Sequence, residues 1–213
     1  MSAPDRRSGE DPGAPHEGTE ASYHEGMRLL QDRFDTRRLA DRLDERLGRS
    51  AFTADDRAFI EARTMFFLAT ADARGRPDCS YKGGDAGFVR VTGERELVFP
   101  SYDGNGQFRS LGNVMVNAAV GLLFIDFQSP RRLRVNGRAS VADDDASLAM
   151  FEGAQLVVRV RAERVFPNCP RYIHTGGAAE PSAHVPRASC TPAPARWKSM
   201  DFLADVLPQP RRR

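Results

Sequence analysis

From Met65 onward, short turns divide the chain into apolar runs of strand length, and this spacing limits the possible folds more than any other feature. Met65–Thr70 is followed by the turn 72–77 and by a second extended segment, 78–82. Phe88–Val91 and Glu96–Phe99 are joined in the same way. Strands connected by such short turns pair antiparallel, so the sequence predicts β-hairpins.

Three later segments extend this pattern. Val120–Phe127 is continuously apolar, which predicts a strand buried on both faces. Residues 131–142 alternate strictly: Leu133 and Val135 point one way, while Arg132, Arg134, Asn136 and Arg138 point the other. Leu156–Phe166 is a last long strand. Six or seven strands with little else predict a mainly β protein with flanking helices, built as a closed or nearly closed antiparallel barrel.

The regions on either side of these strands differ in composition. Residues 1–21 are polar and rich in Gly and Pro, which predicts a disordered tail. Residues 22–63 form a helical extension, in which Thr53 with Asp56 has the spacing of a capping box. The barrel domain spans 64–166, and a Pro-rich extension, 167–213, packs on the barrel or on a dimer partner.

Composition excludes several classes of protein. Lys and Arg total 31 against 29 Asp and Glu, a net charge of +2, which is too balanced for nucleic-acid binding through a broad basic field. The three cysteines are odd in number and widely spaced, which favours reduced thiols in the cytoplasm. No apolar stretch is long enough to span a membrane. A GxGxxG motif after a strand and a P-loop are both missing, so neither dinucleotide nor P-loop chemistry is predicted.

The stretch 100–110 has the pattern of an anion site. A strand ends at Ser101, a glycine-rich loop follows, and a helix begins with Arg109 and Ser110 in its first turn. Backbone N–H groups at a helix start bind anions, and an arginine adds charge. Lys82, just before Gly83, could reach the same place. The alternative is that Lys82 and Arg109 are solvated surface charges.

Protein-based catalysis has little support in the sequence. The chain has no GxSxG, HExxH or CxxC motif. The spacing of Cys169, His174, His184 and Cys190 fits no compact zinc site, so no metal is predicted. A phosphate site without an evident nucleophile or base indicates a cofactor that supplies the chemistry itself.

Three motifs carry a resemblance to a known family. They are the hairpin LATADARGRPDCSYKGG, the helix–strand unit N-x-x-x-R-S-L-x-N…N-x-x-V-G-L-L-F, and the strand LRVNGRA. Together they resemble the pyridoxamine 5′-phosphate oxidase-like family of FMN-binding split barrels. The similarity covers about residues 67–141, and more loosely 53–166.

The resemblance implies a split β-barrel that forms a homodimer, with FMN at the subunit interface. It places the phosphate-binding roles on Lys82, Ser101, and Arg109 with Ser110. Asn105 and Asn113 are further candidates, Arg132 stands at a flavin-contacting position, and Trp197 is a candidate for stacking near the flavin or for packing.

The chain also departs from the true oxidase. The oxidase begins its second strand with Arg-x-Val-Leu-Leu-Lys, whereas this chain has Pro77 in place of the arginine and keeps only Lys82. Residues that bind pyridoxal phosphate are not evident near the C-terminus. We therefore expect an FMN-dependent oxidoreductase that moves hydride to or from flavin N5 with an unknown small-molecule substrate. A non-catalytic flavin- or haem-binding protein with a sensing or storage role, and a deazaflavin (F420)-dependent reductase, are the alternatives.

Overall fold

A computed structural model describes residues 23–169, 173 and 187. The chain divides into two compact units, residues 1–46 and 47–213, and each is described by itself. The domain boundaries expected from the sequence stay predictions.

The first unit holds two amphipathic helices, α1 (Glu25–Arg33) and α2 (Arg37–Leu47). The last residue of α2, Leu47, already belongs to the second unit. The chain bends between them at Asp35, whose φ of 51° ends the first helix. Tyr23 Oη donates a hydrogen bond of 2.9 Å to the Ala40 carbonyl and joins the two helices. Neither helix has a buried residue, and Leu30 and Phe34 are exposed.

The second unit begins with α3 (Ala54–Glu61), which has the predicted capping box. Thr53 Oγ1 accepts from the N–H of Asp56, and the Asp56 carboxylate accepts from the N–H of Thr53. Phe59 and Ile60 on this helix are buried. The sequence pattern at positions 53 and 56 is therefore confirmed.

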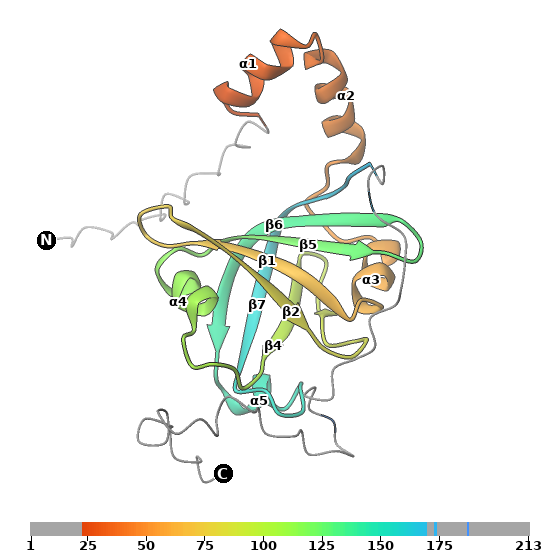
Figure 1. Cartoon of the computed structure of the whole chain (residues 1–213). Coiled ribbons are helices and arrows are strands. Elements are labelled where there is room, and N and C mark those ends of the chain that lie inside the picture. Colours follow the sequence, from red (N-terminus) through yellow and green to blue (C-terminus); the bar gives the residue numbers. More distant parts are fainter. Residues whose placement is uncertain (1–22, 170–172, 174–186, 188–213) are drawn as a thin grey trace, which may run out of the picture. The chain divides into compact units, whose positions relative to one another are not determined.

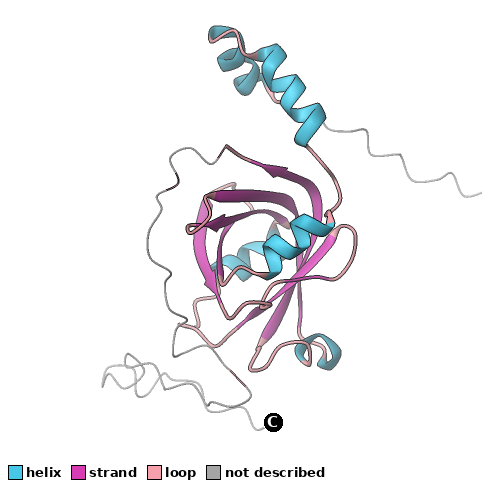
Figure 2. Ribbon diagram, turned by 90° about the vertical axis from the view of Figure 1, so that its right-hand side faces the viewer, coloured by secondary structure: helices cyan, strands magenta, loops and turns pink. Residues whose placement is uncertain are grey.

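The strands form one seven-stranded antiparallel sheet in the order β2-β1-β5-β6-β7-β4-β3 (Figure 1). Their bounds are β1 Met65–Ala71, β2 Pro77–Gly83, β3 Arg90–Val91, β4 Glu96–Ser101, β5 Ala119–Asp126, β6 Arg131–Ala142 and β7 Leu156–Pro167. The sheet curls but does not close (Figure 2), which agrees with the expected split barrel. Two short helices complete the unit, α4 (Arg109–Val116) and α5 (Asp145–Leu148).

Aromatic rings fill the inside of the curled sheet. The ring of Phe66 on β1 lies 5.0 Å from that of Phe99 and 5.1 Å from that of Phe124, measured between centroids, and the ring of Phe88 stacks on it at 5.9 Å. All four rings are buried. Burial of this apolar area drives the curling of the sheet.

The prediction that β5 is buried on both faces is wrong. Val120, Leu122 and Phe124 are buried, whereas Leu123 and Ile125 between them are only partly covered. A single curled sheet has one core, so a strand within it can bury only alternate residues. The outward apolar residues of β5 thus lack cover from the described part of the chain.

Candidate functional site

The strand β2 is an edge of the sheet. It pairs with β1 alone in the sheet order, so alternate backbone N–H and C=O groups along its other side are open to a ligand. Its side chains alternate: Asp78, Ser80 and Lys82 lie on the inner face, opposite the inward residues of β1, while Tyr81 points outward. This alternation places Lys82 on the same face as Asp78 and Ser80.

Helix α4 packs on the inner face of β1 and β2 through a set of polar contacts. Ser110 is buried, and its Oγ lies 2.9 Å from Ser80 Oγ and donates to Asp78 Oδ2 at 3.1 Å. Asn113 Nδ2 donates to the buried Thr70 Oγ1 at 3.1 Å. We call these residues, together with Lys82, the α4 polar seam. Polar groups in such a seam fix the helix start against the strand that carries Lys82.

Lys82 is the cation of this seam. Burial lowers the pKa of its ammonium below the usual 10.5, and the nearby Asp78 carboxylate offsets part of that effect. A partly buried lysine is destabilised in its charged form unless an anion approaches. An anionic group bound here would satisfy the charge, so the environment of Lys82 suits a phosphate.

The loop before α4 brings the helix start into place. Gly106 has a φ of 73°, and Phe108, the residue at the N-cap, has a φ of 48° with no side-chain cap. Asn105 Oδ1 accepts the N–H of Gln107 at 3.0 Å, and Gln107 Oε1 accepts from Arg109 Nε at 3.0 Å. The first turn of α4 therefore lacks a side-chain cap, and the exposed Arg109 extends from it.

The remaining predicted residues are placed as follows. Ser101 ends β4, is partly buried, and its carbonyl accepts the N–H of Gln155 at 2.9 Å. Arg132 is the second residue of β6, and its buried Nε has no hydrogen-bond partner among the described residues. Trp197 lies outside the described residues. The structure thus joins Ser110 and Asn113 to β2 and β1 by hydrogen bonds, whereas no hydrogen bond links the side chain of Ser101 or Arg132 to those strands within the described residues.

A second cluster lies just beyond the end of β2. Asp85 accepts two hydrogen bonds from Arg187, to Oδ2 at 2.7 Å from Nε and to Oδ1 at 2.8 Å from Nη2. Burial raises the pKa of the Tyr102 hydroxyl, and the Asp85 carboxylate raises it further. Tyr102 follows Ser101, so these contacts bring the ends of β4 and β2 to the same region of the molecule.

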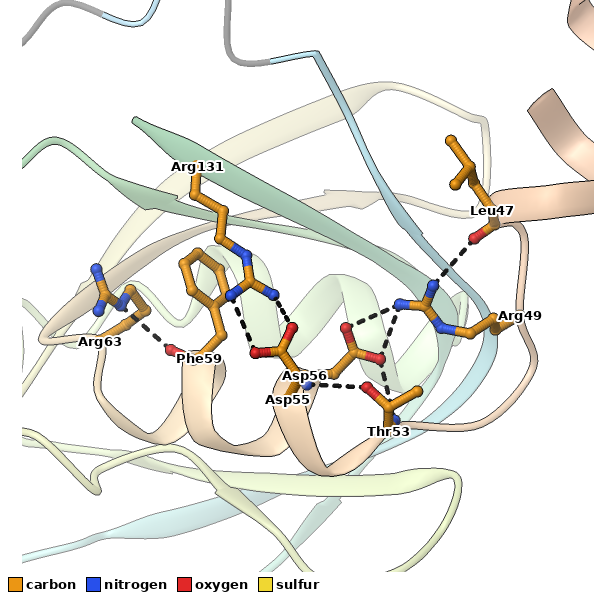
Figure 3. Close-up of polar contacts among 8 residues, drawn as sticks. All are labelled: Leu47, Arg49, Thr53, Asp55, Asp56, Phe59, Arg63 and Arg131. Carbon is orange, nitrogen blue, oxygen red and sulfur yellow. Dashed lines mark hydrogen bonds and ion pairs between the residues drawn. The ribbon is translucent and has the colours of Figure 1, made fainter. Parts of the chain in front are cut away.

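An open depression elsewhere on this unit is lined by paired charges and is a weaker candidate (Figure 3). Arg131 and Arg63 lie over the ring of Phe59, at 4.4 and 4.8 Å from its centroid. Arg131 pairs with Asp55, and Arg63 pairs with Asp126 at 2.7 Å. The arginines there already have carboxylate partners, so the cluster holds α3 against the β5–β6 hairpin.

The sequence reasoning missed Asp78, Ser80 and Thr70 as members of the site. The available signal was the alternation of β2, which puts positions 78, 80 and 82 on one face. Among the described residues no cluster of His, Cys, Asp and Glu could hold a metal ion, although His174, His184 and Cys190 lie outside them. No helix in the described ranges is long and apolar enough to cross a membrane.

The curled, unclosed sheet with its flanking helices defines an antiparallel split barrel. The family model for pyridoxamine 5′-phosphate oxidase matches residues 52–184. This chain therefore belongs to the pyridoxamine 5′-phosphate oxidase family.

Solved structures are similar to part of the chain. A proposed pyridoxamine 5′-phosphate oxidase from Lactobacillus delbrueckii is 27% identical, with a TM-score of 0.45 over 55% of this chain and 95% of that one. The HupZ protein of Group A Streptococcus is 19% identical, with a TM-score of 0.44 over 59% and 99%. An FMN-binding protein from Syntrophomonas wolfei is 12% identical, with a TM-score of 0.42 over 67% and 97%. No curated protein sequence matches the chain.

Proposed function

We propose that this protein binds FMN at the α4 polar seam and uses it as an oxidoreductase on a small-molecule substrate. The observation that carries the proposal is the environment of Lys82: a partly buried ammonium near the end of an edge strand whose Ser80 contacts Ser110 in the first turn of α4. Membership of the pyridoxamine 5′-phosphate oxidase family supports the choice of flavin.

The residues present fit the phosphate end of FMN. Lys82 supplies charge from β2, Arg109 supplies a second cation from the first turn of α4, and the uncapped N–H groups there are further donors. Ser101, Asn105, Ser110, Asn113, Arg132 and Trp197 stay candidates for supporting contacts. Asp78 opposes an anion, so the two cations must outweigh one carboxylate.

The edge of β2 fits the ring of the cofactor. Backbone N–H and C=O groups along an edge strand match the donor and acceptor pattern at the rim of an isoalloxazine. When bound, FMN supplies the hydride donor or acceptor, its N5 atom. The protein then has to bind and orient the cofactor and the substrate, and to exclude water. This role agrees with the lack of a catalytic motif in the sequence.

The assembly proposed with this function is a homodimer in the cytoplasm. The partly covered outward residues of β5, such as Leu123, need an apolar partner, and a second copy supplies one. The three cysteines are odd in number and widely spaced, which favours reduced thiols and supports this location.

The decisive experiment is an absorbance spectrum of the purified protein, with mass spectrometry of the small molecule that it releases. A flavin spectrum and the mass of FMN support the proposal. A Soret band would favour haem instead, and the mass of F420 would favour a deazaflavin reductase.

Two variants then test the site. Lys82→Ala and Arg109→Ala should each weaken FMN binding by roughly 1.5–3 kcal/mol, the usual worth of a charged hydrogen bond. Arg74→Ala, in the exposed β1–β2 turn, is the matched control and should bind FMN as the wild type does. Retention of full affinity in both site variants would contradict the assignment.

A further inference from the structure

The turn that follows β2 carries a carboxylate close to the proposed phosphate site. Asp85 comes three residues after Lys82, with two glycines between them. Burial raises the pKa of the Tyr102 hydroxyl and the Asp85 carboxylate raises it further, so Asp85 lies near the residue that directly follows Ser101. Asp85 therefore stands between the ends of β2 and β4, the two strand ends that carry predicted phosphate ligands.

A carboxylate in this place opposes a bound anion unless a cation neutralises it. Like charges repel over several ångströms, and the repulsion is stronger in a partly buried site than in bulk water. The proposed site already sets two cations, Lys82 and Arg109, against the carboxylate of Asp78 on β2. A second free carboxylate would cancel that balance, and the site would no longer suit a phosphate.

Arg187 supplies the neutralising cation. It reaches Asp85 from the C-terminal extension, 102 positions further along the chain. Its Nε donates to Oδ2 at 2.7 Å and its Nη2 donates to Oδ1 at 2.8 Å, so each oxygen of the carboxylate has a donor of its own. Such two-point contacts are the strong form of an arginine–carboxylate pair. Both side chains are partly shielded from water.

The backbone of the turn is held by other bonds, which come from within the same folded unit. The N–H of Gly84 donates at 3.0 Å to the carbonyl of the residue before β1, and the N–H of Gly87 donates at 2.7 Å to the carbonyl of the last residue of α3. The carbonyl of Asp85 accepts the N–H of Phe88 at 2.9 Å. What Arg187 fixes is therefore the direction and the charge of the Asp85 carboxylate rather than the path of the chain.

We propose that Arg187 is a positioning residue of the FMN phosphate site and acts through Asp85: it holds that carboxylate away from Lys82 and leaves the ammonium free for the phosphate. This inference rests on the proposed function, because the phosphate of FMN is the anion placed at Lys82. It adds a residue of the C-terminal extension to a site whose phosphate ligands otherwise come from β2, β4 and the start of α4.

The charge state of Lys82 agrees with this role. Burial lowers the pKa of its ammonium, and Asp78 is the carboxylate that offsets part of the effect. Asp85 is closer to Lys82 in the sequence than Asp78 is, but its carboxylate, which Arg187 holds, contributes no shift to the pKa of the lysine. Without Arg187, the side chain of Asp85 is free to turn toward Lys82 and to compete with the phosphate for it.

Fluorescence titration of FMN with single and double variants tests this role. Arg187→Ala should weaken FMN binding by about three- to tenfold, since it frees one competing carboxylate. Arg187→Ala/Asp85→Asn should restore the wild-type affinity, because no carboxylate is then left to compete. Arg187→Lys keeps the charge and should bind nearly as tightly as the wild type. Arg74→Ala, in the exposed β1–β2 turn, is the control and should bind FMN as the wild type does.

The double variant distinguishes this role from a merely structural one. If the pair only anchors the C-terminal extension, Asp85→Asn breaks the pair as well, and the double variant stays as weak as Arg187→Ala. That result overturns the inference, and so does an Arg187→Ala variant with wild-type affinity. The midpoint of urea unfolding should stay at the wild-type value in all of these proteins, since the pair is only partly buried. An affinity that falls only together with that midpoint also overturns the inference.

The outcomes separate this inference from the proposed function. A wild type that binds no FMN contradicts both. A wild type that binds FMN, and loses affinity in Lys82→Ala but not in Arg187→Ala, keeps the phosphate site and removes Arg187 from it.

Discussion

Two groups of arginines in the same folded unit have opposite surroundings. Around α3, Arg49, Arg63 and Arg131 each meet a carboxylate, whereas Arg134 and Arg138 on the outward face of β6 meet none in the described part of the chain. The two groups have the same chemistry, and Arg131 of the first lies on the same strand as Arg134 and Arg138 of the second. Their partners, rather than their residue type, show which group holds the fold together and which is available for binding.

The paired group has the geometry of structural ion pairs. Asp56 is 2% exposed and accepts from Arg49 Nη2 with both carboxylate oxygens at 2.8 Å, while it also caps the N–H of Thr53 (Figure 3). Removing a partner from such a contact leaves a charge without compensation. The outward arginines are exposed to water, so their charges carry no such cost.

The largest effect is expected from Asp56→Ala. This change removes the partner of Arg49 and half of the capping box of α3, and it should lower the free energy of unfolding by about 3 kcal/mol. Urea denaturation measures the loss. Asp55→Ala is the matched control, since Asp55 is largely exposed and pairs with Arg131 at the surface, where little loss is expected. Equal losses in the two variants would contradict the structural role of Asp56.

The next effect concerns the pairing of β6 with β7. A Cβ at Gly137 would lie 2.1 Å from the carbonyl oxygen of Arg161, at the irregularity between β6 and β7. Gly137→Ala should therefore force the strands apart and destabilise the fold by about 2 kcal/mol. Gly121→Ala is the control, because its Cβ would have neighbours no closer than 3.8 Å. Thermal unfolding that does not distinguish the two variants would contradict the close approach of β6 and β7.

The fold could be predicted because its signals are local. The turn at 72–77, the capping box at Thr53 and the alternation of 131–142 each lie within a few residues, and all three appear in the structure. The error on Val120–Phe127 has a different cause. An apolar side chain can be buried by its own chain or by a partner, and the sequence gives the same letters in both cases.

The candidate site could be predicted only in part, because its contacts join distant segments. Lys82, Arg109 and Ser110 were recognised from the ends of a strand and a helix, but the bonds of Ser110 to Ser80 and Asp78 span about thirty positions. The net charge of +2 likewise conceals the separation of paired and unpaired arginines. The distribution of charge in space depends on the pairing register of the strands, and composition contains no information on that register.

Lys82 differs from both groups of arginines in that it can lose its proton, so a change of pH can separate its role from theirs. Burial lowers its pKa below 10.5, so the ammonium loses its proton at a lower pH than an ordinary lysine. Because the protonated form binds phosphate, FMN affinity should fall as the pH rises through that lowered pKa. Fluorescence titration of FMN from neutral pH upward measures the fall.

The control for that titration is Lys82→Arg. An arginine keeps its charge throughout this range, so the variant should show a flat profile even if its affinity at neutral pH is reduced. A wild-type profile as flat as that of the variant would show that Lys82 does not bind the phosphate.

The smallest effect is expected from a change at Arg138, on the outward face of β6. Arg138→Glu replaces one member of a like-charge pair and places a carboxylate directly opposite Arg161. The new cross-strand pair should raise the free energy of unfolding by about 0.5 kcal/mol, measured in urea at low salt. A variant that gains stability shows that Arg138 and Arg161 repel each other across β6 and β7. A variant that loses stability instead shows that Arg138 has a structural partner, and the contrast between the two groups of arginines then fails at this position.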